Sequence, residues 1–217
     1  MNRDDANNEI NKSFVQSLRS HTSDTAQDWL ELSIDSVFKE EIAQELPIIK
    51  TIVSASKVGL AIRERSFAKK TLNFLHEFEN GQVDSEKLAD IKLKFEQDEE
   101  FRDRTMDFIV PLLDKFILED KARVLARLFK AYIEEDIVWE RFVILSVCLE
   151  SLNPAGYKYL YQMSQKEHWS INVSNTSDWE NLLIACGIAS RLENKFSVNS
   201  LGRDLYNYGI KYIINVK

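Results

Sequence analysis

The sequence predicts a mainly α-helical protein: a multi-helix bundle of about seven helices with a small winged-helix-like (α+β) C-terminal part. Three observations predict this fold class. The 217 residues are 44% hydrophobic and 29% charged, a composition typical of chains that form a core. The 6 glycines and 3 prolines are too few for the frequent turns of an all-β protein. Apolar residues also recur at helical spacing as far as residue 165.

We expect three segments along the chain. Residues 1–22 begin with a short polar stretch and predict a flexible N-terminal segment. Residues 23–165 carry the helical spacing and predict the bundle. Residues 166–217 predict the winged-helix-like part, packed on the bundle, and strand is expected only there, after Trp169.

The first part of the chain, as far as Ile62, is expected to form three successive helices. A weak helix should run from Asn11 to Arg19, and Ser23 or Asp24 should cap the next one. Pro47 suits the first turn of a further helix, because its missing N–H group is not needed there. The apolar stripe of that helix continues to Ile62.

The following helix is amphipathic. Its apolar stripe contains Phe67, Phe74 and Phe78, and Lys69 and Lys70 are expected on the opposite face. The aromatic face should therefore contribute to the core.

Two further helices should complete this half. Asp84 or Ser85 should cap the first. The second carries an apolar stripe from Phe101 to Phe116 that contains Pro111, which predicts a kink or a break near Val110.

The clearest helical spacing runs from Glu119 to Glu135, with three basic residues on the expected outer face: Arg123, Arg127 and Lys130. Asp136 should cap a helix from Ile137 to Leu152. The run FVILSVCL at the centre of that helix is apolar nearly all round, which predicts the buried middle of the bundle. A core strand is the alternative for that run alone.

The tail after residue 165 has a different pattern. Trp169 to Val173 alternates like a short strand, and Ser177 with Glu180 forms a capping box that opens a helix. Two short strands of a hairpin are expected at IASRL and KFSV, and Asn199 or Ser200 should open a last helix. Helix, strand, helix, hairpin and helix is the order of a winged-helix-like unit.

Charge argues against a nucleic-acid partner. The net charge is −7, and the 7 basic and 5 acidic residues of 151–217 give this tail only +2. The expected recognition helix, SDWENLL, presents Asp178 and Glu180 and contains no Lys or Arg. We therefore expect no binding to duplex DNA, and a DNA-binding regulator is the least favoured alternative.

A membrane surface is the second alternative partner. The most apolar window, Leu46 to Ile62, is too short to span a bilayer, and the N-terminus has no apolar signal-peptide core. A buried helix is the simplest interpretation of that window, and an interfacial amphipathic helix is the alternative. The cations that follow it are candidates for contact with anionic lipid: Arg63, Arg65, Lys69 and Lys70.

The tail is rich in aromatic residues, which are enriched at protein interfaces. Four of them are candidate contacts with a protein partner: Tyr159, Trp169, Trp179 and Tyr206. The alternative is that these side chains pack the tail onto the bundle.

Catalytic, metal and cofactor motifs are not evident. His76 precedes Glu79 by three residues, a spacing that can share a metal, but no second ligand pair has matching spacing. His21 lies in a polar stretch, His168 has no obvious partner, and Cys148 and Cys186 lie in apolar surroundings. Phosphate-binding glycine loops and nucleophile elbows are absent from the sequence. We expect a non-enzymatic protein with no catalytic residue, metal or cofactor.

Parts of residues 45–210 resemble helical bacterial and prophage proteins of the abortive-infection, Abi-alpha-like, type. The resemblance rests on Lys69-Lys70, Leu113-Asp114-Lys115, Lys121-Ala122, Leu128 to Ile133 and Gly202, with Asn199-Ser200 where a Thr is usual. It implies a winged-helix-like ending and a role in phage defence or in a prophage, and it carries over no catalytic residue.

These observations favour a cytoplasmic protein–protein interaction factor from a phage-defence or prophage locus, acting as a homodimer on a protein of unknown identity. A membrane-acting abortive-infection effector is the alternative.

Overall fold

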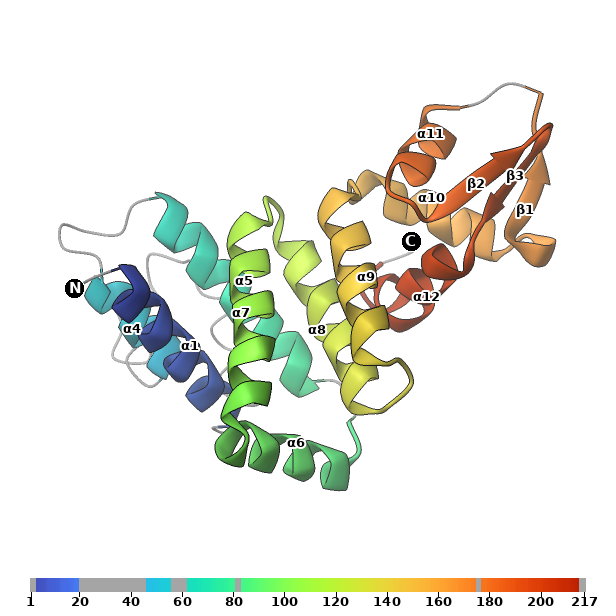
Figure 1. Cartoon of the computed structure of the whole chain (residues 1–217). Helices are drawn as coiled ribbons and strands as arrows, with labels where there is room; N and C mark the ends of the chain where they lie inside the picture. Colours follow the sequence, from blue (N-terminus) through green and yellow to red (C-terminus); the bar gives the residue numbers. More distant parts are fainter. Residues whose placement is uncertain (1–2, 20–45, 56–61, 81–82, 175–176, 215–217) are drawn as a thin grey trace. The chain divides into compact units, whose positions relative to one another are not determined.

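The computed structural model describes residues 3–19, 46–55, 62–80, 83–174 and 177–214. Most of these residues are helical, and a small antiparallel sheet lies near the C-terminus, so the predicted fold class is confirmed (Figure 1). The chain divides into two compact units, residues 1–122 and 123–217. The division falls within helix α8 (Glu119–Ile133), whereas the boundary expected at residue 166 lies inside the second unit.

The first unit is helical throughout its described residues. Its helices before α8 are α1 (Arg3–Arg19), α4 (Pro47–Ala55), α5 (Ile62–Asn80), α6 (Ser85–Gln97) and α7 (Glu99–Lys115). Helix α7 packs against α1, α5 and α6, and α1 also packs against α4 (Figure 1). Fully buried Phe14 and Phe74 lie 5.6 Å apart between ring centroids and join α1 to α5 in the core.

Helix α1 differs from the flexible N-terminal segment expected at residues 1–22. It starts at Arg3, well before Asn11, and its Phe14, Val15 and Leu18 are buried. The buried Ser17 hydroxyl accepts a 3.1 Å hydrogen bond from the backbone N–H of Ile48 in α4. A flexible segment was predicted because the first residues are polar. A helix with one apolar face can still be ordered by packing that face against its neighbours.

The predicted helix from Pro47 begins as expected, but its stripe does not reach Ile62. Ile62 instead opens α5 and is 88% exposed. The expected cap at Ser23 or Asp24 lies outside the described residues, as does His21. Asp84 caps α6 as predicted, accepting hydrogen bonds from the backbone N–H groups of residues 86 and 87.

Helix α7 runs unbroken through Pro111, so the prediction of a break near Val110 is wrong, and the alternative, a kink, stays a prediction. Pro111 is exposed. The carbonyl that loses its intrahelical donor belongs to Asp107, which is also exposed, so water can satisfy it.

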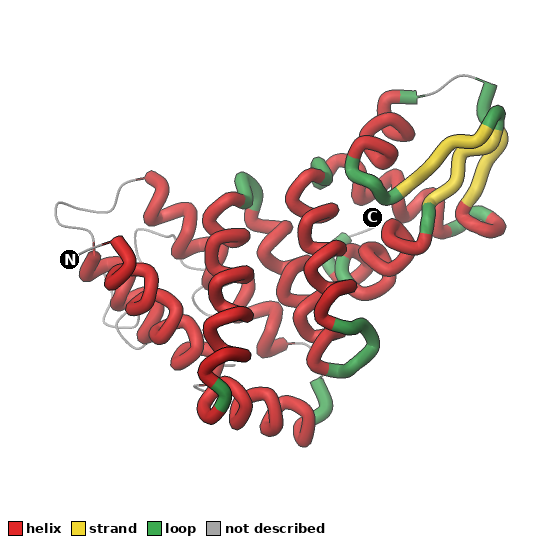
Figure 2. Tube along the Cα trace, in the orientation of Figure 1, coloured by secondary structure: helices red, strands yellow, loops and turns green. Residues whose placement is uncertain are grey.

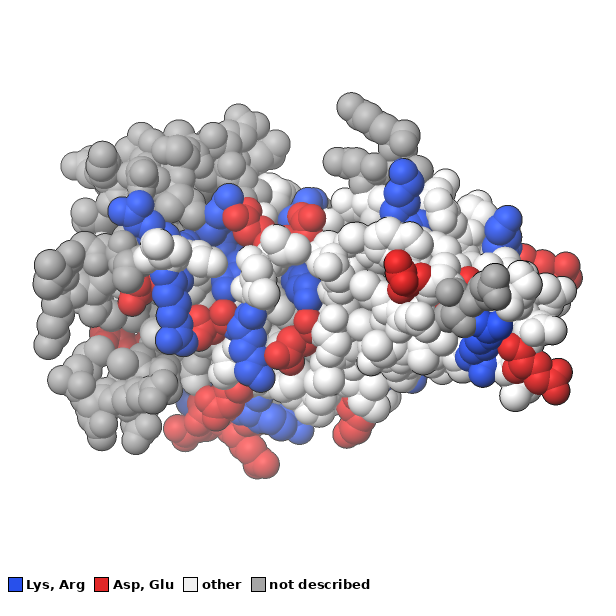
Figure 3. All heavy atoms as spheres, turned by 90° about the horizontal axis from the view of Figure 1, so that it is seen from above, with Lys and Arg blue, Asp and Glu red and all other residues white. Residues whose placement is uncertain are grey.

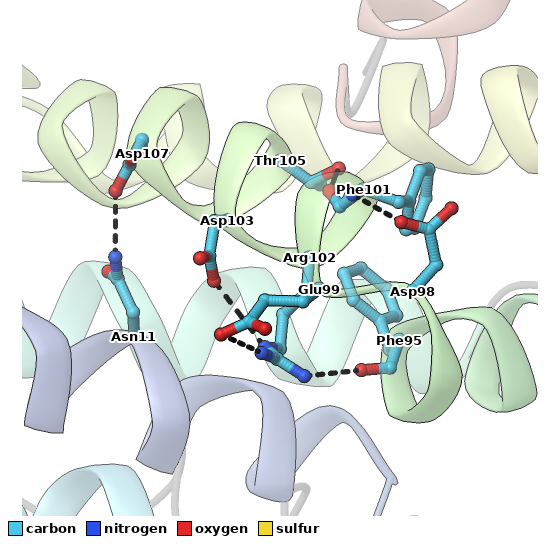
Figure 4. Close-up of polar contacts among 9 residues, drawn as sticks. All are labelled: Asn11, Phe95, Asp98, Glu99, Phe101, Arg102, Asp103, Thr105 and Asp107. Atoms are coloured by element: carbon cyan, nitrogen blue, oxygen red, sulfur yellow. Dashed lines mark hydrogen bonds and ion pairs between the residues drawn. The ribbon is translucent and has the colours of Figure 1, made fainter.

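Around residue 98 the α6–α7 junction is closely hydrogen-bonded. Asp98 caps α7 by accepting from the Phe101 N–H at 2.8 Å, and Arg102 reaches back to the Phe95 carbonyl and to Glu99 and Asp103 (Figure 4). The acidic run at residues 98–100 therefore acts as a helix start.

The second unit combines helices with the sheet. After α8 come α9 (Trp139–Ser151), α10 (Ala155–Ser164), a 3₁₀ turn η2 (Glu167–Trp169), β1 (Ser170–Asn172), α11 (Asp178–Ala185), β2 (Ala189–Leu192), β3 (Lys195–Val198), α12 (Ser200–Tyr208) and η3 (Ile210–Tyr212). The three strands are antiparallel in the order β1-β3-β2, so β3 is the central strand (Figure 2). Phe196 of β3 pairs with Ile171 of β1 at one edge and with Arg191 of β2 at the other.

The tail follows its predicted order closely. Ser177 and Glu180 form the capping box of α11, and Asn199 caps α12 by accepting from the Gly202 N–H at 3.1 Å. Gly202 is required for packing, because a Cβ atom there would lie 2.3 Å from the Ile188 carbonyl oxygen. The hairpin and the last helix can therefore approach closely.

Three predictions about α8 and α9 are wrong. Lys130, expected on an outer face, is buried, because α8 is covered around most of its circumference. Asp136 does not cap α9: the N-cap is Val138, with no side-chain hydrogen bond, and the helix starts at Trp139. Helix α9 is also not buried all round, since Ile144 is 45% and Val147 51% exposed.

Candidate functional site

Helix α11 of the second unit presents the most informative surface for function. It begins at a capping box and is only eight residues long, DWENLLIA. Trp179 on this helix is 44% exposed, and Asp178 beside it is exposed as well. The helix has no Lys or Arg. Figure 3 shows that the surface over the C-terminal part of the chain is mostly uncharged, with separate Lys and Arg side chains on it. Helix α11 itself lacks the cations that phosphate contacts need.

Glu180 does not face a partner, contrary to the argument from its charge. It is buried, and its carboxylate accepts hydrogen bonds at 3.4 Å from the Tyr159 hydroxyl and from the backbone N–H of Ser177. Burial, followed by the negative charge of Glu180, raises the pKa of Tyr159. Glu180 therefore joins α10 to the start of α11, and Asp178 is left as the exposed acid.

The four aromatic candidates are not equivalent in the structure. Tyr159 is half-buried, and its ring centroid lies 6.1 Å from that of Phe196 on β3. Half-buried Trp169 contacts buried Tyr206 edge to face at 5.4 Å. These three side chains make contacts within the second unit, whereas Trp179 presents nearly half of its surface to solvent.

Leu192, which was not among the predicted contact residues, lies at the end of β2 and is 79% exposed. A signal was present in the sequence. Side chains alternate along a strand, so Leu192 lies on the same side of β2 as exposed Ser190 and opposite buried Ala189. An apolar residue at an exposed hairpin end is consistent with a contact surface.

The four candidate cations of α5 do not form a single exposed group. The Lys70 ammonium is buried and donates hydrogen bonds to the backbone carbonyls of Asp114 at 2.9 Å and Phe116 at 2.7 Å. Its predicted position opposite the phenylalanines is therefore wrong. Burial lowers the pKa of Lys70, although the nearby Asp114 carboxylate opposes this shift.

The other three cations lie near the surface. The Arg63 guanidinium pairs with the Asp114 carboxylate, and the Lys69 ammonium lies 2.5 Å from a Glu119 carboxylate oxygen. Arg65 is exposed. The acidic partners of Arg63 and Lys69 would compete with lipid headgroups for these two cations.

Histidine, cysteine and carboxylate side chains are the groups that would carry metal or nucleophilic chemistry. Groups of His, Cys, Asp and Glu that could hold a metal ion are absent from the described residues. Burial raises the pKa of the Cys148 thiol, so little of the reactive thiolate forms near neutral pH. His168 lies 3.2 Å from Glu167 in an exposed turn, and His76 lies beside the Asn80 amide. In the described part of the chain, no helix is long and apolar enough to cross a membrane.

No family model, curated protein or solved structure matches this chain.

DNA binding gives a direct test of the α11 surface. Purified protein should not bind duplex DNA with sub-micromolar affinity at physiological salt, because α11 offers no cation and exposes Asp178. A gel-shift titration with random and prophage-derived duplexes would measure this. Sequence-dependent sub-micromolar binding would contradict the expectation and favour a DNA-binding regulator.

Liposome flotation tests the membrane alternative. The protein should not float with anionic vesicles at low or high salt, because Lys70 is buried and Arg63 and Lys69 are paired with acids. The matched variant changes Arg63, Arg65 and Lys69 to Gln and leaves Lys70 in place. Flotation of the wild type that salt weakens and the variant loses would support the membrane effector instead.

Proposed function

We propose that this chain is a non-enzymatic protein-binding factor whose contact surface includes α11. The observation that carries the proposal is Trp179: a large aromatic side chain, 44% exposed, on a helix without Lys or Arg. Exposed aromatic side chains are enriched among residues that dominate the binding energy of protein interfaces. The winged-helix-like module would then bind protein through the helix that reads DNA in other winged-helix proteins.

The origin in a phage-defence or prophage locus is proposed from the resemblance of the Lys69-Lys70, Leu113 to Lys115 and Leu128 to Ile133 stretches to abortive-infection proteins. This support is associational, because a shared fold does not define a shared function. A cytoplasmic location and a homodimer belong to the same proposal. Light scattering of the purified chain would test the homodimer.

Quantitative capture from phage-infected cells tests the contact surface. Trp179→Ala should reduce the recovery of a specific partner about tenfold or more, as truncation of a central aromatic contact commonly does. The variant should remain folded, because the side chain is substantially exposed. Val138→Ser, at an exposed apolar residue of the same unit, is the matched control and should leave recovery unchanged.

The readout is the amount of each protein captured by wild type and by the two variants, measured side by side by mass spectrometry. Equal recovery of every specific partner by the wild type and Trp179→Ala would remove α11 from the proposed interface. Loss of recovery in Val138→Ser alone would move the interface to the start of α9.

A further inference from the structure

A pocket in the first unit has a chemical character of its own. It encloses about 400 Å³ between α1, α5 and α7, a volume within the usual range of small-ligand sites. Its apolar wall includes Ile10, Phe67, Val110 and Pro111. Its polar lining includes the carboxylates of Glu64, Asp107 and Asp114, together with the Arg63 guanidinium.

The charges of the lining do not cancel. Arg63 directs both Nε and Nη2 at Asp114, so these two groups neutralise each other. Asp107 accepts a 2.9 Å hydrogen bond from the neutral amide of Asn11, which leaves its negative charge uncompensated (Figure 4). Three carboxylates against one guanidinium leave the lining with a net charge of −2.

Glu64 carries the strongest indication of a ligand. Its Oε2 atom is buried and has no hydrogen-bond partner. Arg63 lies close enough to interact electrostatically with Glu64, but it uses its hydrogen bonds on Asp114. A buried carboxylate oxygen without a donor is costly. Glu64 lines the pocket, so a rotation of its carboxylate toward the cavity would let this oxygen accept a hydrogen bond from a cationic N–H donor that enters.

We propose that this pocket binds an ammonium or guanidinium group carried on an aliphatic chain. The charged end would donate to Glu64 and Asp107, and the chain would lie against Phe67 and Val110. Anions are excluded by the net negative lining, and a neutral apolar ligand would leave the Glu64 oxygen unpaired. The same chemistry is found in a free polyamine and in a lysine or arginine side chain of a polypeptide. The inference is independent of the proposed function, which rests on the second unit.

Isotope-labelled protein can be titrated with three cationic probes and followed by NMR: spermidine, N-acetyl-lysinamide and N-acetyl-argininamide. Binding should shift the backbone signals of residues near Phe67 and Val110. Glu64→Gln should weaken binding about tenfold, since it keeps an acceptor oxygen but removes the negative charge that strengthens the hydrogen bond to a cation. Glu100→Gln, at an exposed residue of α7, is the matched control and should bind as the wild type does.

A second variant, Asp107→Asn, keeps the shape of the side chain and protects the test against misfolding of Glu64→Gln. It should also weaken binding. Shifts with the amides alone identify a polypeptide side chain as the ligand, and shifts with spermidine alone identify a free polyamine. The proposal is overturned if none of the three probes shifts these signals, if N-acetyl-glutamate binds as well as they do, or if both variants bind with unchanged affinity.

Discussion

Leu145→Asp should unfold the second unit or leave it barely folded. Leu145 is fully buried on the same face of α9 as Phe142 and Leu149. Removing a buried leucine side chain alone costs about 2–5 kcal/mol. The new carboxyl group adds a second cost. In the apolar core it must either be protonated, at a pKa that burial raises, or carry a desolvated charge, and both lower the free energy of unfolding further. The total approaches the stability of a typical domain, about 5–15 kcal/mol.

The neighbouring position provides the control. Ile144 is 45% exposed, so Ile144→Asp should lower the free energy of unfolding by less than about 1 kcal/mol. Urea titration followed by tryptophan fluorescence is suitable, because Trp139, Trp169 and Trp179 lie in the second unit and Trp139 contacts Phe142. Equal midpoints for the two variants would show that α9 is not buried on its Leu145 face.

Lys70→Met should destabilise the first unit by about 3–6 kcal/mol, since it removes two hydrogen bonds from a charged group and each contributes about 1.5–3 kcal/mol. Methionine fills a similar volume but cannot donate to the Asp114 and Phe116 carbonyls, which lie at the C-terminal end of α7. Backbone carbonyls at a helix end need donors, and a cation there also interacts favourably with the helix dipole.

Lys69→Met is the matched control one residue away. Lys69 makes an ion pair with Glu119 in which both side chains are substantially exposed, so its loss should cost no more than about 1 kcal/mol. Hydrogen exchange of peptides from α5 and α7, measured by mass spectrometry, would report the first unit separately from the second. Similar protection in the two variants would contradict a capping role for Lys70.

Local signals in the sequence were sufficient to predict most of the helix caps and strands of residues 166–217. The capping box of Ser177 and Glu180, the Asn199 cap and the β2–β3 hairpin are all where residue patterns predicted them. Such features depend on side chains that bond to backbone groups within a few residues. A short stretch of sequence therefore contains all the information that is needed.

Helix faces were predicted less well, because their burial depends on distant segments. Lys69 and Lys70 are adjacent and chemically identical, yet one pairs at the surface and the other is buried beneath the end of α7, more than forty residues later in the chain. Likewise, the apolar run in α9 predicted burial all round, but only one side of that helix is covered.

For the candidate site residues, too, some properties followed from the sequence and others depended on tertiary contacts. Sequence alone predicted an acidic helix without cations and identified Trp179, because residue type determines charge and aromatic character. Tertiary structure decided that Glu180 is buried beneath Tyr159, that Tyr206 packs on Trp169, and that Trp179 is left exposed. It also placed Glu64 and Asp107, from two helices, in one pocket. Local spacing determines which face of a helix is apolar, but the partner that covers this face depends on contacts that no local pattern records.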